Sequence, residues 1–196
     1  MSNNIHYHFI GIGGIGMSGI AEVIISKQYS VSGSDLISNE QTRKLIGKGA
    51  TIFDNQNQKN IDFILEKYSN KTIIAVVSSA IGKDNIELSY CIEKKIVIKH
   101  RSEILSLIMN NYQSIGVSGT HGKTSTSTFL FTLLDLCTSN VSGIIGGILP
   151  IYEKNYFIKT SKYFIAELDE SDGSISNYKN NLGIITNIDY DHCDFY

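Results

Sequence analysis

The fold of the first half of the chain is decided by the stretch His6-Tyr7-His8-Phe9-Ile10-Gly11-Ile12-Gly13-Gly14-Ile15-Gly16. An apolar run of strand character passes directly into the pattern GxGxxG, which opens a helix expected over Ile15–Lys27. In such a unit the first glycine makes a tight turn, the second lets the backbone approach a diphosphate, and the third allows close helix–strand packing. The stretch therefore predicts a nucleotide-diphosphate site, although a glycine turn without a ligand is the alternative.

Outward from this loop, short apolar runs alternate with longer amphipathic ones. We expect strands over Tyr29–Ser32, Ala50–Phe53, Thr72–Ser78 and Ile96–Lys99, and helices over Asn39–Lys48, Asn85–Lys94 and Arg101–Asn110. This alternation is typical of a parallel sheet covered by helices on both faces. Asp35 follows the loop at the distance where dinucleotide-binding folds place an acid against a ribose, about 20 residues. Both NAD and a UDP-sugar fit this pattern.

A second glycine loop, Gly119-Thr120-His121-Gly122-Lys123-Thr124, follows an expected strand over Ser114–Ser118 and opens a helix from about Gly122 to Leu136. In such a cradle backbone amides wrap phosphate oxygens, the lysine neutralises terminal phosphates and a hydroxyl reaches Mg²⁺. The strict P-loop pattern has a glycine where Val117 stands, so the loop departs from it by one residue. The hydroxyl-rich run that includes Ser125 is poor helix sequence and fits a helix start that faces phosphate.

Carboxylates follow two further expected strands, Tyr163–Leu168 and Leu182–Ile188. Glu167 lies at the end of the first, and His192 lies among aspartates after the second. Oxygen ligands at the carboxyl ends of parallel strands are placed to hold Mg²⁺ beside ATP phosphates. A solvated polar loop is the alternative for each segment.

The two loops together narrow the function. A dehydrogenase has no use for an ATP cradle, so the pair predicts an enzyme that holds a nucleotide-bearing substrate in one domain and ATP in the next. We expect a Rossmann-like parallel-sheet domain over residues 1–111, followed by a truncated P-loop-type α/β ATP-binding domain over residues 112–196.

Composition excludes several classes of partner. The 17 Lys and Arg residues nearly balance the 19 Asp and Glu residues, so there is no basic field for nucleic acid or an anionic membrane. The hydrophobic content of 42% is that of a folded protein. Cysteines stand far apart without a CxxC pair, which favours the reducing cytoplasm, and we expect all three to be buried: Cys91, Cys137 and Cys193.

These motifs together resemble the Mur ligase family. The resemblance covers the whole chain in the family's order and rests on His8–Gly19, Val31–Asp35, Val77–Ile81, His100–Glu103, Gly119–Thr124, Ala166–Asp172 and Asn187–His192. Any one motif is moderately specific, and the set is very specific. Within the family the first glycine loop is closest to the enzymes that attach L-alanine to UDP-N-acetylmuramate.

The resemblance implies an ATP-dependent ligation in peptidoglycan precursor synthesis. The substrate carboxylate would attack the γ-phosphate of ATP to give an acyl phosphate, and the amine of L-alanine would then displace phosphate. It implies three sets of residues. UDP-N-acetylmuramate would contact Gly11, Ile12, Gly13, Gly14, Ile15, Gly16, Asp35, Ser78, Ser79 and Arg101. ATP would contact Gly119, Thr120, His121, Gly122, Lys123, Thr124 and Ser125. The catalytic residues would be Lys123, Glu167 and His192, with Mg²⁺ on Thr124, Glu167 and His192.

Full-length family members carry a complete central domain and a third domain, so the resemblance implies a truncated ligase that binds the UDP-sugar, binds ATP weakly and does not ligate alone. Three alternatives stay open. One is a non-catalytic UDP-sugar-binding fragment. Another is the related ligase that attaches a recycled peptide to the same UDP-sugar. The third is a nicotinamide-dependent oxidoreductase, which rests on the first loop and Asp35 alone.

Overall fold

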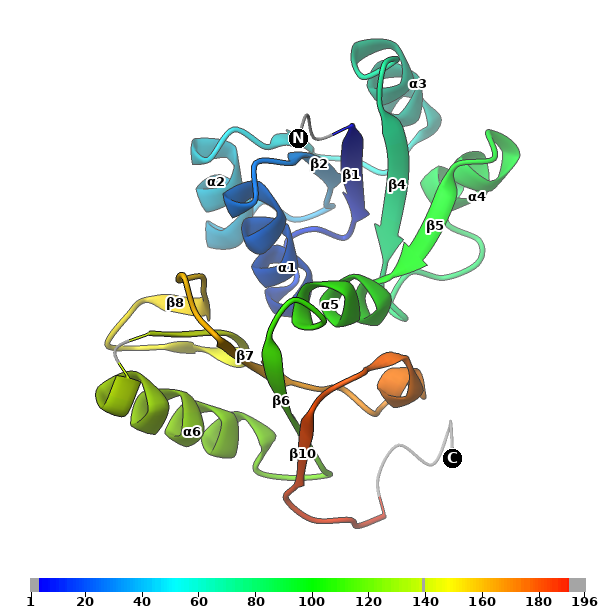
Figure 1. Ribbon diagram of the computed structural model, residues 1–196. Helices are drawn as coiled ribbons and strands as arrows, with labels where there is room; N and C mark the ends of the chain where they lie inside the picture. The colour runs from blue at the N-terminus through cyan, green and yellow to red at the C-terminus, as the bar shows by residue number, and fades with distance from the viewer. Residues whose placement is uncertain (1–3, 139, 191–196) are drawn as a thin grey trace. The chain divides into compact units, whose positions relative to one another are not determined.

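The computed structural model describes residues 4–138 and 140–190. The chain divides into two compact α/β units, Met1–Arg101 and Ser102–Tyr196 (Figure 1). The sequence places the domain boundary ten residues later, after residue 111. Helix α5 (Arg101–Met109) begins at the division between the units. None of the helices in the described ranges is long and apolar enough to cross a bilayer.

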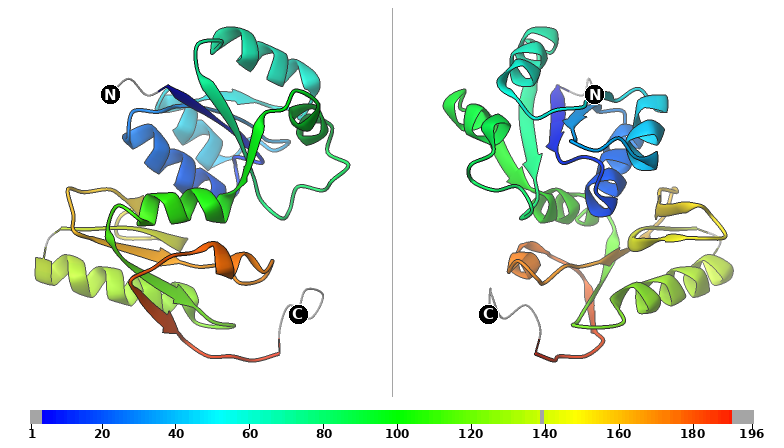
Figure 2. Two further views of the ribbon diagram at one scale, coloured as in Figure 1. Left: turned by 45° about the vertical axis from the view of Figure 1, so that its right-hand side comes forward. Right: turned by 180° about the vertical axis from the view of Figure 1, so that it is seen from behind.

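The first unit is built on a parallel sheet of order β3-β2-β1-β4-β5. Its strands are β1 (Ile5–Ile10), β2 (Ser30–Ser34), β3 (Thr51–Phe53), β4 (Thr72–Val77) and β5 (Val97–His100). The connecting helices are α1 (Ile15–Ser26), α2 (Glu40–Gly47), α3 (Gln58–Lys67) and α4 (Ile86–Glu93). Helix α1 packs beside α2, and α3 packs beside α4 on the opposite face of the sheet (Figure 2). This confirms the Rossmann-like parallel sheet, whose strand order reverses between β1 and β4.

The face of β1 that is turned toward α3 and α4 carries both apolar and polar side chains. Ile10 packs in a core with Ile61 and Ile64 of α3 and Cys91 of α4. Because side chains alternate along a strand, His6 and His8 lie on this same face of the sheet. Both histidines are fully buried. The α3–α4 face therefore combines an apolar core with buried polar groups.

Helix α3 is absent from the expected elements. The residues before it are rich in Asn and Gln, which favour turns and caps, so the segment has the composition of a loop. In the structure this capping tendency of asparagine begins the helix, because the Asn57 side chain accepts a hydrogen bond from the Lys59 amide at 2.9 Å. The helix then buries Asn60 together with Ile61 and Ile64.

The second unit has a sheet of order β10-β6-β9-β7-β8, in which only β8 is antiparallel to its neighbour. Its elements are β6 (Gln113–Ser118), α6 (Lys123–Thr138), β7 (Val141–Leu149), β8 (Lys154–Phe157), β9 (Tyr163–Glu167), the 3₁₀ helix η1 (Ser174–Asn177) and β10 (Leu182–Ile185). Helix α6 packs on β7, β9 and β6 over a core that includes Phe131, Ile145 and Ile165.

The β7–β8 hairpin is also absent from the expected elements. Three glycines interrupt the apolar run of β7, and glycine lowers strand propensity. The structure shows why one of them is there. A Cβ on Gly143 would lie 2.6 Å from the carbonyl oxygen of Ile165, so only glycine lets β7 approach β9 this closely.

The expectation that the cysteines are buried is wrong for Cys137, which is exposed in the last turn of α6. Its neighbours on the outer face of that helix are exposed as well, so no core is available to cover it. Cys91 is fully buried, and burial with the nearby Glu87 carboxylate raises the pKa of its thiol to about 12. Cys193 lies outside the described residues.

Candidate functional site

The first glycine loop connects β1 to α1 at the carboxyl edge of the sheet. Gly11 adopts a φ of +80°, and the amides of Gly11 and Ile12 both donate to the Ser34 carbonyl, at 2.8 and 3.0 Å. Helix α1 then begins at Ile15 without a side-chain cap on its N-terminus. The first-turn amides of a helix have no partner within the helix and carry its positive dipole end, so the predicted loop has the geometry of an anion site.

Asp35 braces this loop. Its Oδ2 accepts a hydrogen bond from the Gly13 amide at 2.7 Å, and its Oδ1 accepts one from the Ile37 amide at 3.0 Å. Asn39 donates from Nδ2 to the Gly13 carbonyl at 3.0 Å. A Cβ on Gly13 would lie 2.8 Å from both the Asp35 carboxylate and the Asn39 amide nitrogen. The acid that the sequence places near a ribose is thus also a structural partner of the loop.

A cleft of about 420 Å³ opens beside Gly11 at the carboxyl ends of the strands. Its walls come from the end of β2 (Asp35, Leu36 and Ile37), the β3–α3 loop (Gln56) and the β4–α4 loop (Ala80, Ile81, Gly82, Asp84 and Asn85). It lies where the strand order reverses between β1 and β4, and ligands of open α/β sheets bind at such switch points. The apolar pair Leu36–Ile37, directly after Asp35, is a sequence signal that could have indicated this wall of the cleft.

The remaining residues predicted for the UDP-sugar lie near the same loop. A guanidinium nitrogen of Arg101 lies 3.3 Å from where a Cβ on Gly16 would stand. Ser78 and Ser79 follow β4 directly, and the cleft lining begins at the next residue, Ala80. The first loop, Asp35 and Arg101 therefore come together in the first unit.

The second glycine loop connects β6 to α6 and is held by the chain that follows β10. Gly119 and Gly122 have φ values of +125° and +81°. The Asn187 side chain accepts from the His121 amide and donates to the His121 carbonyl, both at 2.9 Å. A Cβ on Gly119 would lie 2.8 Å from the Asn187 carbonyl oxygen, so the two segments fit only with glycine at this position.

Within this cradle the Lys123 ammonium makes three contacts. It donates to the carbonyls of Gly119 and Thr120 at 2.6 and 3.2 Å and forms an ion pair with Glu170 at 2.6 Å. Both charged side chains are largely covered, at 18% exposure each. A phosphate placed at this loop would meet a lysine whose charge is already shared with a carboxylate.

The predicted magnesium ligands Thr124 and Glu167 lie together. The Thr124 hydroxyl donates to Glu167 Oε1 at 3.0 Å, and the Gly146 amide donates to Oε2 at 2.9 Å. A Cβ on Gly146 would overlap the Glu167 carboxylate, so glycine in β7 makes room for it. Across residues 4–138 and 140–190 no group of three or more His, Cys, Asp or Glu side chains gathers at one point. One carboxylate and one hydroxyl fit Mg²⁺, which keeps several waters and binds substrate phosphates.

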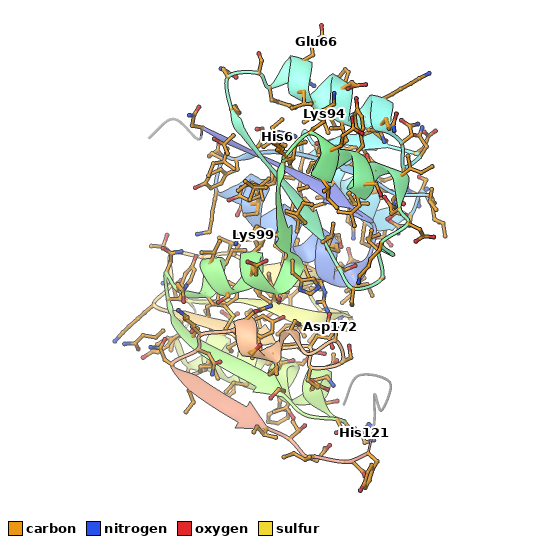
Figure 3. The ribbon with its side chains drawn as sticks, turned by 90° about the vertical axis from the view of Figure 1, so that its right-hand side faces the viewer. His6, Glu66, Lys94, Lys99, His121 and Asp172 are labelled. Atoms are coloured by element: carbon orange, nitrogen blue, oxygen red, sulfur yellow. The ribbon has the colours of Figure 1, made fainter. Side chains whose placement is uncertain are left out.

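The other predicted residues of the second loop are placed as follows. His121 is exposed at the side of the sheet where β10 ends (Figure 3). Ser125 is exposed in the first turn of α6. His192 lies outside the described residues. Sequence reasoning placed Glu170 and Asn187 only among the polar residues that follow two strands as possible Mg²⁺ ligands, and it gave Gly146 no role. In the structure Glu170, Asn187 and Gly146 hold Lys123, the loop backbone and Glu167.

Comparison with protein families covers both units. Residues 6–113 match the family described as "Mur ligase family, catalytic domain". The chain belongs to the Mur ligase family. Residues 117–196 match its "Mur ligase middle domain", so the Mur ligase segments meet between residues 113 and 117.

Individual relatives of this Mur ligase chain agree with that assignment. A UDP-N-acetylmuramate–L-alanine ligase of Prochlorococcus marinus subsp. pastoris is 59% identical over 191 residues, covering 97% of this chain and 40% of that protein. The corresponding protein of Trichormus variabilis is 42% identical, with 97% and 42% covered. The chain thus spans about 40% of the length of the curated relatives it matches.

Solved structures share the fold. A UDP-N-acetylmuramate-alanine ligase from Thermotoga maritima aligns with a TM-score of 0.83 at 28% identity, covering 97% of this chain and 43% of that one. A UDP-N-acetylmuramate:L-alanyl-γ-D-glutamyl-meso-diaminopimelate ligase from Neisseria meningitides aligns with a TM-score of 0.85 at 22% identity, covering 97% and 63%. The second likeness concerns the fold alone.

In this Mur ligase chain the Glu170→Gln substitution is expected to tighten ATP binding about 3- to 10-fold. Incoming phosphates must take Lys123 from the Glu170 carboxylate and then lie beside that negative charge, which glutamine lacks. Calorimetric titration of the chain with ATP measures the change, and added salt should reduce it. Glu153→Gln, on the exposed β7–β8 turn, is the control. Unchanged or weaker ATP binding by Glu170→Gln would contradict the competition between carboxylate and phosphate.

Proposed function

We propose that the chain provides the UDP-N-acetylmuramate site and the ATP-phosphate site of an ADP-forming ligase that joins L-alanine to UDP-N-acetylmuramate. The observation that carries the proposal is the pairing of Lys123 and Thr124 with Glu170 and Glu167, in a chain whose first unit carries a separate GxGxxG loop. The family consists of ATP-dependent ligases that generally use Mg²⁺. The Prochlorococcus relative, which is named for this activity, supports the choice of L-alanine.

In this proposal the first unit binds and orients the UDP-sugar. The diphosphate lies against the Gly11–Gly16 loop and is received by the N-terminus of α1, because the amides of Gly11–Gly13 already donate hydrogen bonds within the protein. Arg101 beside Gly16 adds positive charge, and the cleft next to Gly11 takes part of the nucleotide. Ser78 and Ser79 offer hydroxyls at the end of β4. These groups hold the substrate in an orientation that leaves its carboxylate free to react.

The second unit prepares the phosphate for attack. In the Gly119–Ser125 loop the amides at the start of α6 receive the phosphates, because the His121 amide already donates to Asn187. Lys123 neutralises the β- and γ-phosphates. Thr124 and Glu167 would hold Mg²⁺, with His192 proposed as a further ligand. When bound, Mg²⁺ neutralises charge that develops on the transferring phosphoryl group. The carboxylate oxygen then bonds to phosphorus as the bond to ADP breaks. The amine of L-alanine displaces the phosphate and loses a proton, which leaves an amide.

The proposed domain division separates the UDP-sugar site from the ATP site. Residues 1–111 form the UDP-sugar-binding domain, and residues 112–196 form part of the ATP-binding domain. The proposed location is the cytoplasm, where ATP is at hand as a co-substrate.

The first test is a pair of titrations on the 196-residue chain. We expect saturable binding of UDP-N-acetylmuramate that UDP competes away, and no fluorescence change with NADH. Binding of NADH in place of the UDP-sugar would contradict the assignment and favour the oxidoreductase reading.

The second test is phosphate release with ATP, Mg²⁺ and UDP-N-acetylmuramate, with and without L-alanine. Release that requires L-alanine would support ligation by this chain. Release that requires a peptide beginning with L-alanine would favour the peptide-attaching ligase. UDP-sugar binding without any release would favour the non-catalytic binding fragment.

A further inference from the structure

A chain of hydrogen-bonded polar side chains, half-buried at its start and fully buried from His6 onward, crosses the α3–α4 face of the first unit. Its members run in the order Lys71, Ser30, His6, Ser32, His8 and Glu87, each hydrogen-bonded to the next at 2.7–3.2 Å. Figure 3 shows His6 within the unit, where its ring stacks on Tyr68 with centroids 3.7 Å apart. Burial, followed by the charges of nearby basic groups, lowers the pKa of His6 to about 3. His6 is therefore neutral at pH 7, and no proposed step of the reaction uses it.

The chain ends at Glu87, which has no exposed surface. Glu87 accepts from His8 on β1 at 3.2 Å, from the side-chain amide of Asn60 on α3 at 2.9 Å, and from the hydroxyl of Ser34 at the end of β2. Four elements therefore meet at one carboxylate: β1, β2, α3 and α4. A buried carboxylate keeps its charge only where such donors surround it.

Two of these contacts, and the helix that carries Glu87, lead directly to the walls of the cleft. Ser34 precedes Asp35, which begins the β2 wall and braces Gly13. Asn60 donates from the same amide nitrogen to the carbonyl of Asn55 at 2.9 Å, which fixes the chain before Gln56.

The third connection is the helix that carries Glu87. Asn85 caps this helix by accepting from the Leu88 amide at 2.9 Å, and its Nδ2 donates to the Gln56 side chain at 2.7 Å. Asn85 and Gln56 both line the cleft. The wall at the start of α4 is thus joined to the β3–α3 wall both at the cleft surface and through Glu87 beneath it.

We propose that Glu87 is a positioning residue for nucleotide binding, whose buried carboxylate fixes the end of β2, the β3–α3 loop and the start of α4 against one another. The proposal rests on the proposed binding of a uridine nucleotide in this cleft. A buried ion contributes little net stability compared with an apolar residue of similar size, because its desolvation offsets its contacts. Its specific effect is on the relative placement of the groups that it joins, and small misplacements of binding groups are costly.

The test compares three variants of the 196-residue chain. Glu87→Gln keeps the shape but replaces one acceptor oxygen by a donor. Cys91→Ala truncates another fully buried residue one turn along the same helix face, and because the thiol is protonated it changes no charge. Ser34→Ala removes a single donor to the carboxylate. Each variant is checked for folding by circular dichroism. Amide hydrogen exchange of residues 35–38, 54–57 and 80–86 is then measured without ligand, followed by titration with UDP and with ATP.

Glu87→Gln is expected to speed exchange in all three segments about tenfold and to weaken UDP binding about tenfold, the scale of one lost charge-assisted hydrogen bond. ATP binding, which belongs to the second unit, should stay unchanged. Cys91→Ala should lower the unfolding temperature but leave exchange in these segments and UDP affinity within about twofold of the parent, because it removes no connection between the walls.

Equal effects of Glu87→Gln and Cys91→Ala on exchange and affinity would overturn the proposal, since general destabilisation would then explain both. If Glu87→Gln does not fold, Ser34→Ala decides, and unchanged exchange over residues 35–38 would overturn it. If the parent chain binds no UDP while Glu87→Gln still loosens the three segments, the nucleotide assignment of the cleft fails and the organising role of Glu87 stands.

Discussion

Replacing Lys123 with alanine is expected to weaken ATP binding to the 196-residue chain by about 10- to 150-fold, the range of one hydrogen bond to a charged group. The ammonium group is the cationic side chain that the structure places within the second loop, in contact with the carbonyls of Gly119 and Thr120. Its loss also removes the ammonium group that faces Glu170, so this carboxylate repels the phosphate more strongly. Calorimetric titration with ATP and Mg²⁺ measures the change.

The control for this prediction is Lys154→Ala, which removes an exposed lysine of β8 from the same unit. Binding of UDP-N-acetylmuramate should be the same in both variants, because its proposed site lies in the first unit. Retained ATP affinity in Lys123→Ala would mean that the second loop does not bind phosphate. A parallel loss of UDP-sugar affinity would mean that the substitution damages the whole chain.

The elements that could be predicted are those specified by local sequence. The strand–glycine–helix units at Gly11–Gly16 and Gly119–Thr124 were found because their spacing is a local property, and the parallel sheets follow from the alternation of apolar and amphipathic runs. The hairpin of β7 and β8 could not be found in this way. Glycine is required at two positions of β7 because the Ile165 carbonyl and the Glu167 carboxylate lie close to the backbone there. These neighbours are distant in sequence, so no local pattern indicates them.

The candidate site shows the same division. The family resemblance implied Thr124 and Glu167 as joint magnesium ligands, and the structure brings the two side chains within hydrogen-bond distance. The contacts that hold Lys123, Glu167 and the loop backbone in place were not anticipated. Glu87 lies in the first turn of a helix, where an acidic residue is ordinarily explained by the helix dipole. Only the packed structure shows that this carboxylate is buried and joins several elements, and is not solvated. Asp35 likewise combines its expected position with an unexpected bond to Gly13.

Replacing Gly13 with alanine is expected to weaken UDP-N-acetylmuramate binding about 100-fold. The new Cβ would lie 2.8 Å from Asp35 Oδ2 and from Asn39 Nδ2. Neither side chain is free to move away at little cost, because Asp35 also accepts from the Ile37 amide and Asn39 caps α2 by accepting from the Thr42 amide. The loop must therefore shift, and a shift of about 1 Å in a binding group costs on the order of a hundredfold. Calorimetric titration with the UDP-sugar measures the loss.

The matched control is Gly47→Ala in the same unit, because a Cβ at that position at the end of α2 meets no atom within 4 Å. It should leave UDP-sugar affinity unchanged, and both variants should bind ATP as the parent chain does. Equal UDP-sugar affinities for Gly13→Ala and the parent would refute the placement of the diphosphate on the first loop. A loss in both glycine variants would instead point to a general effect of the added methyl group on the fold. A loss confined to Gly13→Ala ties binding to the point where the loop meets Asp35 and Asn39, since the substitution disturbs both contacts.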